Sequence, residues 1–330
     1  MYGHIYLRHK QKNTMKKLFT IALVIAGMNL AHAQSTGKVH GKIFSNFNYN
    51  ASDEAAAFEI SRAYLGYKYK YNDQWSVKVT FDVGGTDTYA RTAYLKVAAL
   101  KWKATDKLTV NIGQVGLKQF KTQEKNWGYR YIAKSSQDRY KMGTSADMGF
   151  TADYKLSDML AVDLTVVNGE GYKKDQADSN LKTGFGLTVK ATDALTLRVY
   201  TDAVAKSDVD STSYPSQNTV ALFAGYKGEA FRLGAEYNTQ TAHKNVDGGD
   251  YEIISAYGTY YVNDQVGAFA RYDVVSCDEG GYDGKNGDYL IAGLEYRPVK
   301  GVSISANVQG YTPEDGDAEN SVYMNLQYKF

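Results

Sequence analysis

Long apolar runs are missing from this sequence. Its 330 residues have a mean hydropathy of −0.45, and they nowhere include the roughly 20 consecutive apolar residues that one membrane-spanning helix needs. This excludes a helical membrane protein. Proline occurs three times and cysteine once. The single cysteine, Cys277, cannot form an intramolecular disulfide, so the fold needs no such bridge.

Catalytic motifs are missing as well. The sequence has no Gly-x-Ser-x-Gly, His-Glu-x-x-His or Cys-x-x-Cys pattern, and three of its five histidines precede residue 34. The remaining two, His40 and His243, lie in no nucleophile context. Residues 276–288 and 312–319 are acidic but lack the spacing of a calcium-binding loop, so we interpret them as solvated loops; Ca²⁺ binding through their oxygens is the alternative. We expect no enzyme, no cofactor and no metal site.

The N-terminus has the features of an export signal. Met15-Lys16-Lys17 is a basic start, Leu18 to Met28 is apolar but too short to span a bilayer, and Ala31-His32-Ala33 is a small-x-small cleavage pattern. We expect residues 1–33 to be upstream sequence and a signal peptide cleaved after Ala33, and residues 34–330 to form one domain. A buried helix of a cytosolic domain is the alternative. Five of the 38 basic residues and none of the 36 acidic ones lie in the leader, so the mature chain has a formal net charge of −3.

After residue 34 the chain alternates between apolar and polar or small residues. Segments of about ten residues show this period of two, which places one face of a β-strand in an apolar environment and the other in a polar one. The clearest examples lie at 108–112, 160–166, 185–189, 195–199 and 302–308. The 29 tyrosines fit such strands, because a ring with a hydroxyl suits both the membrane edge and a water-filled lumen.

The breaks between these segments alternate between short turns and long loops. Short turns fall at residues 72–73, 105–106, 157–158, 192–193, 227–228, 263–264 and 300–301. Long loops fall at about 50–57, 84–91, 117–145, 168–182, 206–218, 241–250, 276–288 and 312–319. Short turns at one end and long loops at the other are typical of outer-membrane barrels. Seven turns and eight loops predict an all-β, transmembrane antiparallel β-barrel of about 16 strands; a soluble β-sandwich is the alternative.

The last segment supports an outer-membrane destination. Val322, Met324, Leu326, Tyr328 and Phe330 alternate with polar or amphipathic residues, and the chain stops on Phe330. An amphipathic final strand that ends in an aromatic residue resembles the signal read by the outer-membrane assembly machinery. We therefore expect that machinery, outer-membrane lipid and lipopolysaccharide to be partners, and we expect no nucleic acid.

The longest segment without alternation, residues 117–145, is strongly basic. Seven basic residues in it oppose only Glu124 and Asp138, a local net charge of +5 in a mature chain of −3. Folded into a wide barrel, this third loop would narrow the pore and favour anions. The alternative is a solvated surface loop. The predicted selectivity residues are Lys118, Lys121, Lys125, Arg130, Lys134, Arg139 and Lys141. Their spacings suggest short helical turns, which Gly128 and the Ser135-Ser136 pair interrupt.

Basic residues also lie on the polar faces of the predicted strands. Acidic residues such as Asp82, Asp163 and Asp273 share those faces, so the basic excess is slight and a mixed lumen is expected. The basic residues assigned to the lumen wall are Lys78, Lys96, Arg198, Arg232 and Arg271.

The leader, the strand rhythm, the basic loop and the aromatic terminus together resemble the phosphate-selective porin O/P family. The resemblance is strongest over Arg130–Phe150, RYIAKSSQDRYKMGTSADMGF, where the loop re-enters a strand. It implies a sixteen-stranded, typically trimeric anion channel with a basic constriction, to which Arg130, Lys134, Arg139 and Lys141 would contribute. The chain departs from the family in being short and in showing no evident run of arginines along one lumen track.

These features predict an outer-membrane porin for small hydrophilic solutes that favours anions, phosphate among them. A non-specific diffusion porin, and a surface adhesin or structural barrel, are the alternatives.

Overall fold

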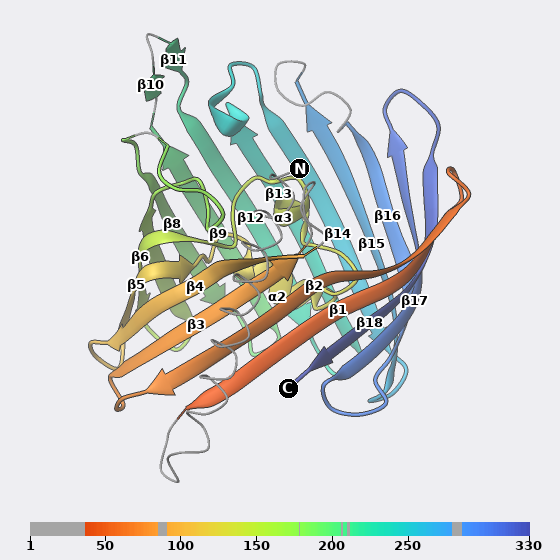
Figure 1. Cartoon of the computed structure of the whole chain (residues 1–330), viewed down its shortest axis with the longest axis horizontal. Coiled ribbons are helices and arrows are strands. Elements are labelled where there is room, and N and C mark those ends of the chain that lie inside the picture. Colours follow the sequence, from red (N-terminus) through yellow and green to blue (C-terminus); the bar gives the residue numbers. More distant parts are fainter. Residues whose placement is uncertain (1–36, 85–90, 178, 206, 210–211, 279–285) are drawn as a thin grey trace, which may run out of the picture.

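The computed structural model describes residues 37–84, 91–177, 179–205, 207–209, 212–278 and 286–330. The expected signal peptide lies outside these residues. Antiparallel strands form one closed barrel, in which each strand pairs with its neighbours in the chain and β1 pairs with β18. The predicted sixteen-stranded antiparallel barrel is therefore confirmed. Figure 1 shows the strands tilted, with long loops at one end and short turns at the other.

The barrel strands have the following bounds. The first nine are β1 (Lys38–Asn50), β2 (Ala55–Lys70), β3 (Trp75–Gly84), β4 (Thr92–Lys103), β5 (Leu108–Gly116), β6 (Ala146–Lys155), β7 (Leu160–Val167), β8 (Lys182–Lys190) and β9 (Leu195–Val204). The other seven are β12 (Gln217–Lys227), β13 (Phe231–Thr241), β14 (Tyr251–Tyr261), β15 (Val266–Cys277), β16 (Gly287–Tyr296), β17 (Val302–Pro313) and β18 (Glu319–Lys329).

The remaining elements lie in the long loops. A two-stranded hairpin, β10 (Ser207–Val209) with β11 (Thr212–Tyr214), occupies the connection between β9 and β12, where the sequence indicated only a loop. Two helices, α2 (Lys121–Trp127) and α3 (Ser136–Arg139), lie in the loop 117–145, and the 3-10 turn η1 (His243–Asn245) follows β13. Among the described residues, no helix has the length and apolar character needed to cross a membrane.

The apolar residues of the strands point outward. On the neighbouring strands β17 and β18, the paired residues Val308 and Val322 are each about half exposed, whereas Asn307 and Asn325 point inward and are buried. The period of two therefore separates an apolar outer face from a polar inner face. Aromatic side chains gather on the outer face near the short turns. They include Tyr71, Trp102, Tyr154, Tyr226, Phe231, Tyr260, Tyr296 and Tyr328.

Two β-bulges shift the register in the first part of the barrel. One lies at Ser61 on β2, opposite Phe44 and Ser45, and the other at Lys96 on β4, opposite Thr80 and Phe81. A bulge inserts one unpaired residue and re-aims the side chains around it. Both bulges adjoin the wall that faces the inserted loop.

Candidate functional site

The loop 117–145 runs inside the barrel (Figure 1, yellow). Its first helix, α2, ends at Gly128, which adopts a left-handed conformation (φ 76°), and its second, α3, follows Ser135. These are the residues that the sequence identified as helix interruptions. Gly128 suits this turn because it has no Cβ to clash in the left-handed region. The loop therefore crosses the lumen as two short helices joined by a compact turn.

Aromatic residues of the loop pack against the inner wall. Trp127 lies 5.3 Å from the ring of Tyr257 on β14 and 6.1 Å from that of Phe269 on β15, while Tyr129 lies 4.3 Å from Phe269. The Trp127 indole N–H donates to the carbonyl of Ala133 at 3.0 Å, so its polar atom is satisfied. The largest buried apolar cluster in the described residues thus lies inside the barrel and holds one side of the loop against the wall.

Arg271 fixes the middle of the loop. Its guanidinium forms an ion pair with Asp273 and donates from Nη1 to the backbone carbonyl of Lys134 at 2.5 Å. The same guanidinium lies 5.3 Å from the Trp127 ring centre. Arg271 and Asp273 are almost fully buried. The arginine predicted on the lumen wall points inward but lies beneath the loop.

Arg198 fixes the start of the loop in the same way. It pairs with Asp163 on β7 through two hydrogen bonds of 2.6 and 3.0 Å, and it donates to the backbone carbonyl of Lys118 at 3.2 Å. Arg198 is also buried. A buried charge is costly unless it is paired, so Asp163 offsets the cost of burying the Arg198 guanidinium, which also donates to the loop.

Further contacts complete the anchoring. Lys182 on β8 pairs with Asp202 at 2.7 Å and donates to the side-chain oxygen of Gln119 at 3.1 Å. On β13, Glu236 accepts a hydrogen bond from Ser136 at 2.9 Å. Three buried cations, each neutralised by its own carboxylate, therefore bind the loop at separate points.

The opposite side of the loop is charged and faces β1–β4. Arg130 forms ion pairs with Glu124 at 3.3 Å and with Asp138 at 3.2 Å. Lys121 pairs with Glu124 at 2.5 Å, and Lys134 lies 3.8 Å from Asp138. Two carboxylates thus hold three basic side chains in one row along the loop.

The facing wall has a cluster around one buried carboxylate. Asp82 on β3 accepts hydrogen bonds from Arg62 on β2 at 2.9 Å and from the Tyr172 hydroxyl at 2.6 Å. The Lys96 ammonium on β4 lies 3.5 Å from Asp82, 5.0 Å from the Tyr64 ring centre and 4.9 Å from that of Tyr172. Two cations therefore share one acid on this wall.

The loop and the wall lie within electrostatic range of each other. Lys42 on β1 interacts with the charges of Lys121 and Arg130, and Lys96 interacts with those of Arg130 and Asp138. We call the facing groups the constriction set. Its members are Lys42, Arg62, Lys78, Lys96, Lys121, Arg130 and Lys134 with Asp82, Glu124 and Asp138. Seven basic and three acidic side chains give it a formal net charge of +4.

The other four basic residues predicted in the loop lie outside the constriction set. Lys118 forms an ion pair with Asp153 on β6, away from the constriction set. Lys125 is exposed on α2. The Arg139 guanidinium lies 3.4 Å from the ring centre of Tyr289 on β16. Lys141 is exposed, has a positive φ of 59°, and lies in range of Lys244 beyond β13. Of the predicted loop set, Lys121, Arg130 and Lys134 come together.

Five members of the constriction set were not among the predicted selectivity or lumen-wall residues: Lys42, Arg62, Asp82, Glu124 and Asp138. Arg62 and Asp82 lie on inward-facing positions, but neither belongs to the basic loop and only Asp82 was noted on a polar face. Arg62 could have been found from the alternation of β2, because its side chain lies on the same face of that strand as the side chain of Lys68. The shared carboxylate could not be read from the sequence, because it depends on which strands are neighbours.

Basic residues continue from the constriction set towards both ends of the barrel. Towards the long loops, the charge of Lys134 interacts with that of Lys141, then Lys141 with Lys244, and Lys244 with Lys174. Towards the short turns, Lys78 interacts with Lys68, and Lys42 interacts with Lys329. The sequence showed no evident run of arginines along one track. The structure instead brings together in one basic track lysines from the loop 117–145, β1, β2, β3 and β18, with Lys174 between β7 and β8 and Lys244 in η1.

Burial changes the titration of two lysines in the loops. It lowers the pKa of the Lys134 ammonium below its ordinary value of 10.5, with Asp138 acting in the opposite direction. Burial and the nearby positive charges of Lys141 and Lys174 lower the pKa of Lys244. Both groups lose their charge at a lower pH than an exposed lysine. In the described part of the chain, no group of three or more His, Cys, Asp or Glu side chains is arranged to hold a metal ion.

No protein-family model and no curated protein sequence matches the chain. Solved structures do match it over nearly its whole length. OmpF of Salmonella typhi in complex with daunomycin has a TM-score of 0.69 at 13% identity and covers 89% of this chain and 97% of its own. An anion-selective porin from Comamonas acidovorans has a TM-score of 0.66 at 10% identity, covering 90% of this chain and 100% of its own.

A third match bears on assembly. The trimer form of OmpT, an outer-membrane protein of Vibrio cholerae, has a TM-score of 0.65 at 17% identity and covers 90% of this chain and 99% of its own. At such identities the similarity concerns the fold, and the resemblance to the phosphate-selective family stays a prediction. The chain has the sixteen-stranded barrel fold of outer-membrane porins.

Proposed function

We propose that the protein is an outer-membrane porin through which small hydrophilic solutes diffuse passively, with a preference for anions. The constriction set carries this proposal, because its seven basic and three acidic side chains face one another across the space between the loop and β1–β4. Excess positive charge between low-dielectric walls raises the local concentration of anions and repels cations.

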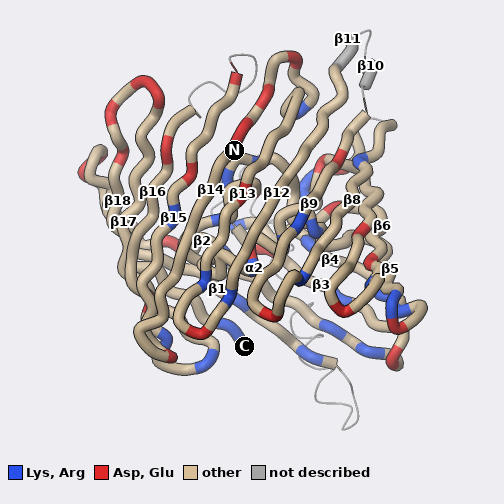
Figure 2. Tube along the Cα trace, turned by 180° about the vertical axis from the view of Figure 1, so that it is seen from behind, with Lys and Arg blue, Asp and Glu red and all other residues tan. Residues whose placement is uncertain are grey.

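The distribution of charge along the barrel also supports a preference for anions. Acidic residues gather on the long loops beyond β13–β18 (Figure 2), whereas the basic track lies inside. An anion that passes the outer loops meets positive charge at each successive level. Lysines lie at both ends of this track, and Arg130 links Lys134 to Lys42 between them.

The pairing pattern supports a general anion preference over recognition of phosphate. Arginine binds phosphate through two parallel N–H groups. Arg62 and Arg130 of the constriction set are already ion-paired with Asp82, Glu124 and Asp138. Lysine acts as a point charge for any anion. We therefore infer attraction by charge without selection of a particular anion.

The outer face supports a location in the outer membrane. It combines exposed apolar residues with the band of aromatic residues near the short turns, and aromatic bands mark the interfaces of membrane barrels. By this proposal, membrane lipid and lipopolysaccharide surround the apolar face. The short turns then face the periplasm.

A homotrimer belongs to the same proposal. Phe58 on β2 is 87% exposed and packs against Phe47 on β1, with a distance of 4.9 Å between their ring centres. Ile60 extends this apolar patch. A second copy of the chain would cover it. We expect Phe58→Lys to convert trimers to monomers in native mass spectrometry, whereas Phe231→Lys on the distant strand β13 leaves them intact. Trimers in both variants would contradict this assembly.

Reversal potentials under a KCl gradient test the proposed function. Purified protein in planar bilayers should give large conductance steps with an anion-selective potential. Replacing Lys121, Lys125 and Arg130 together by Gln should lower the anion-to-cation permeability ratio. Lys155→Gln Lys190→Gln, which neutralises lysines beside short turns, should leave it unchanged.

The other outcomes separate the alternatives. Large steps with the same reversal potential in the triple variant would leave a non-specific porin. The absence of steady current in the unmodified protein would instead favour a structural barrel or an adhesin.

A further inference from the structure

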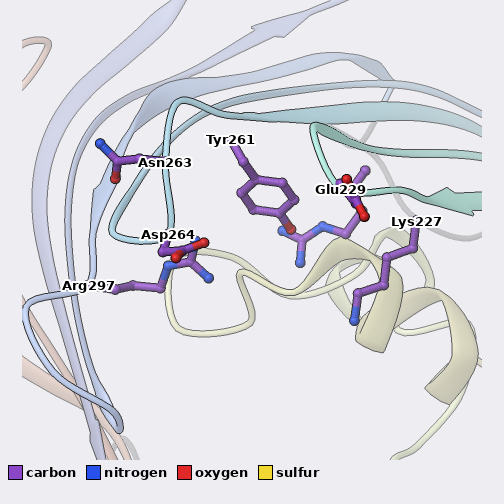
Figure 3. A pocket seen from close by; sticks show the side chains of 7 residues that line it. Lys227, Glu229, Tyr261, Asn263, Asp264 and Arg297 are labelled. Atoms are coloured by element: carbon purple, nitrogen blue, oxygen red, sulfur yellow. The ribbon is translucent and has the colours of Figure 1, made fainter.

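A pocket opens at the short-turn end of the barrel, away from the constriction set. It has a volume of about 400 Å³ and lies between the turns that follow β12, β14 and β16. Figure 3 shows Tyr261 pointing into it, with Arg297 and Lys227 reaching in from opposite sides and the inserted loop beside them. Its lining residues are Lys227, Glu229, Arg232, Tyr261, Asn263, Asp264 and Arg297.

Two arginines share the aromatic wall of this pocket. The guanidinium of Arg232 lies 5.8 Å from the centre of the Tyr261 ring, and that of Arg297 lies 5.4 Å from it. A guanidinium is planar and presents pairs of N–H donors that match a carboxylate. The pocket therefore places two such donors around one apolar surface.

The loop holds Arg232 in position. A Cβ atom at Gly128 would lie 2.2 Å from Nη1 of Arg232, so only glycine lets the guanidinium lie this close to the end of α2. Arg232 also lies 4.8 Å from the Tyr129 ring centre and donates from Nη2 to Thr259 at 3.1 Å. Its buried Nε has no hydrogen-bond partner among the described residues.

Three carboxylates limit what the pocket accepts. Glu295 is buried and already pairs with Arg297 at 3.5 Å, and it accepts a hydrogen bond from the Tyr131 hydroxyl at 3.1 Å. Glu229 and Asp264 lie exposed on the turns at the rim. The rim carboxylates repel a second negative charge at the outer end of a ligand. The pocket is also larger than a bare inorganic anion needs, and the Tyr261 ring favours an apolar body.

We propose that this pocket binds a small organic monocarboxylate from the short-turn side. Its carboxylate lies between Arg232 and Arg297, and its apolar body lies against Tyr261. This binding is separate from the charge-based preference of the constriction, so each can fail without the other.

Titration calorimetry of the folded protein in detergent micelles tests this site, with benzoate as the probe. Benzoate should bind more tightly than inorganic phosphate, which has no apolar body, and more tightly than terephthalate, whose second carboxylate would meet Glu229 and Asp264. Arg232→Gln Arg297→Gln should weaken benzoate binding at least about tenfold, the effect of losing a hydrogen bond to a charged group.

Matched variants separate binding from folding and from conduction. Lys155→Gln, at a different short turn, should bind benzoate like the unmodified protein. Arg130→Gln should also retain benzoate binding while it changes the reversal potential. Arg232→Lys keeps the charge without the planar fork and should give an intermediate affinity. Unchanged benzoate affinity in the double variant, or no benzoate binding to the unmodified protein, would overturn the proposal.

Discussion

Arg271 on β15 donates a hydrogen bond of 2.5 Å to the backbone carbonyl of Lys134, in the middle of the inserted loop. The bond joins a residue of the barrel wall to a residue of the constriction set. Since Arg271 also pairs with Asp273 and lies over Trp127, one side chain links the wall, the buried aromatic cluster and the charged face of the loop.

We therefore expect Arg271→Gln to destabilise the barrel and loosen the loop. The change leaves Asp273 buried without its partner, which costs about 3 kcal/mol or more. The temperature at which the folded band is lost in heat-modifiability gels should fall, and single-channel conductance should become larger and noisier.

The double variant Arg271→Gln Asp273→Asn controls for the stranded charge. It should recover much of the thermal stability, because the buried carboxylate is gone, but it should keep the noisy conductance. If conductance in both variants matches that of the unmodified protein, Arg271 does not hold the loop.

Removing an acidic side chain from the constriction set should raise the anion-to-cation permeability ratio, whereas removing a basic one should lower it. Asp82→Asn frees Arg62 and Lys96 from their shared carboxylate. The anion-to-cation permeability ratio should rise by up to about thirtyfold, because removing one unit charge about 4 Å away in water stabilises an anion and destabilises a cation by about 1 kcal/mol each. Asp158→Asn on a short turn is the control. A lower ratio in Asp82→Asn would contradict the location of the constriction.

Anion preference should also weaken at alkaline pH. Burial lowers the pKa of Lys134 and of Lys244, so both ammonium groups lose their charge below the ordinary lysine value of 10.5. As the pH rises from 7 towards that value, the reversal potential should move towards the cation side. In Lys134→Arg, whose guanidinium stays protonated, the change should be smaller. An identical pH dependence in the two proteins would show that Lys134 does not contribute to the change in reversal potential.

Closure of the barrel between its first and last strands can also be tested. Gly41 on β1 and Phe330 exchange two backbone hydrogen bonds of 3.0 and 3.1 Å, and a Cβ at Gly41 would lie 2.2 Å from the Phe330 ring. We expect Gly41→Val to displace the ring and Phe330→Ala to remove it. Both should lower the yield of heat-resistant folded barrel, while Phe231→Ala should not. Normal yields for both seam variants would show that the ring does not matter for closure.

The barrel could be predicted from the amino-acid sequence alone. Alternation with a period of two is a property of the extended backbone, so it identifies the outward residues of each strand without any tertiary information. Turn lengths then determined the number of strands and the end at which the long loops lie. The net charge of the loop 117–145 was also evident, as were the helix breaks at Gly128 and Ser135.

Which charged side chains meet could not be predicted in this way, because it depends on the folded chain. Arg198 and Arg271 have the same inward register as Lys96, yet they are buried against the loop, whereas Lys96 faces it across the lumen. Lys118 pairs with Asp153, and Arg62 joins the constriction set. These outcomes depend on the path of the loop through the closed barrel, which brings residues more than 100 positions apart into contact. Local periodicity specifies the face of a strand, but long-range packing specifies its partner.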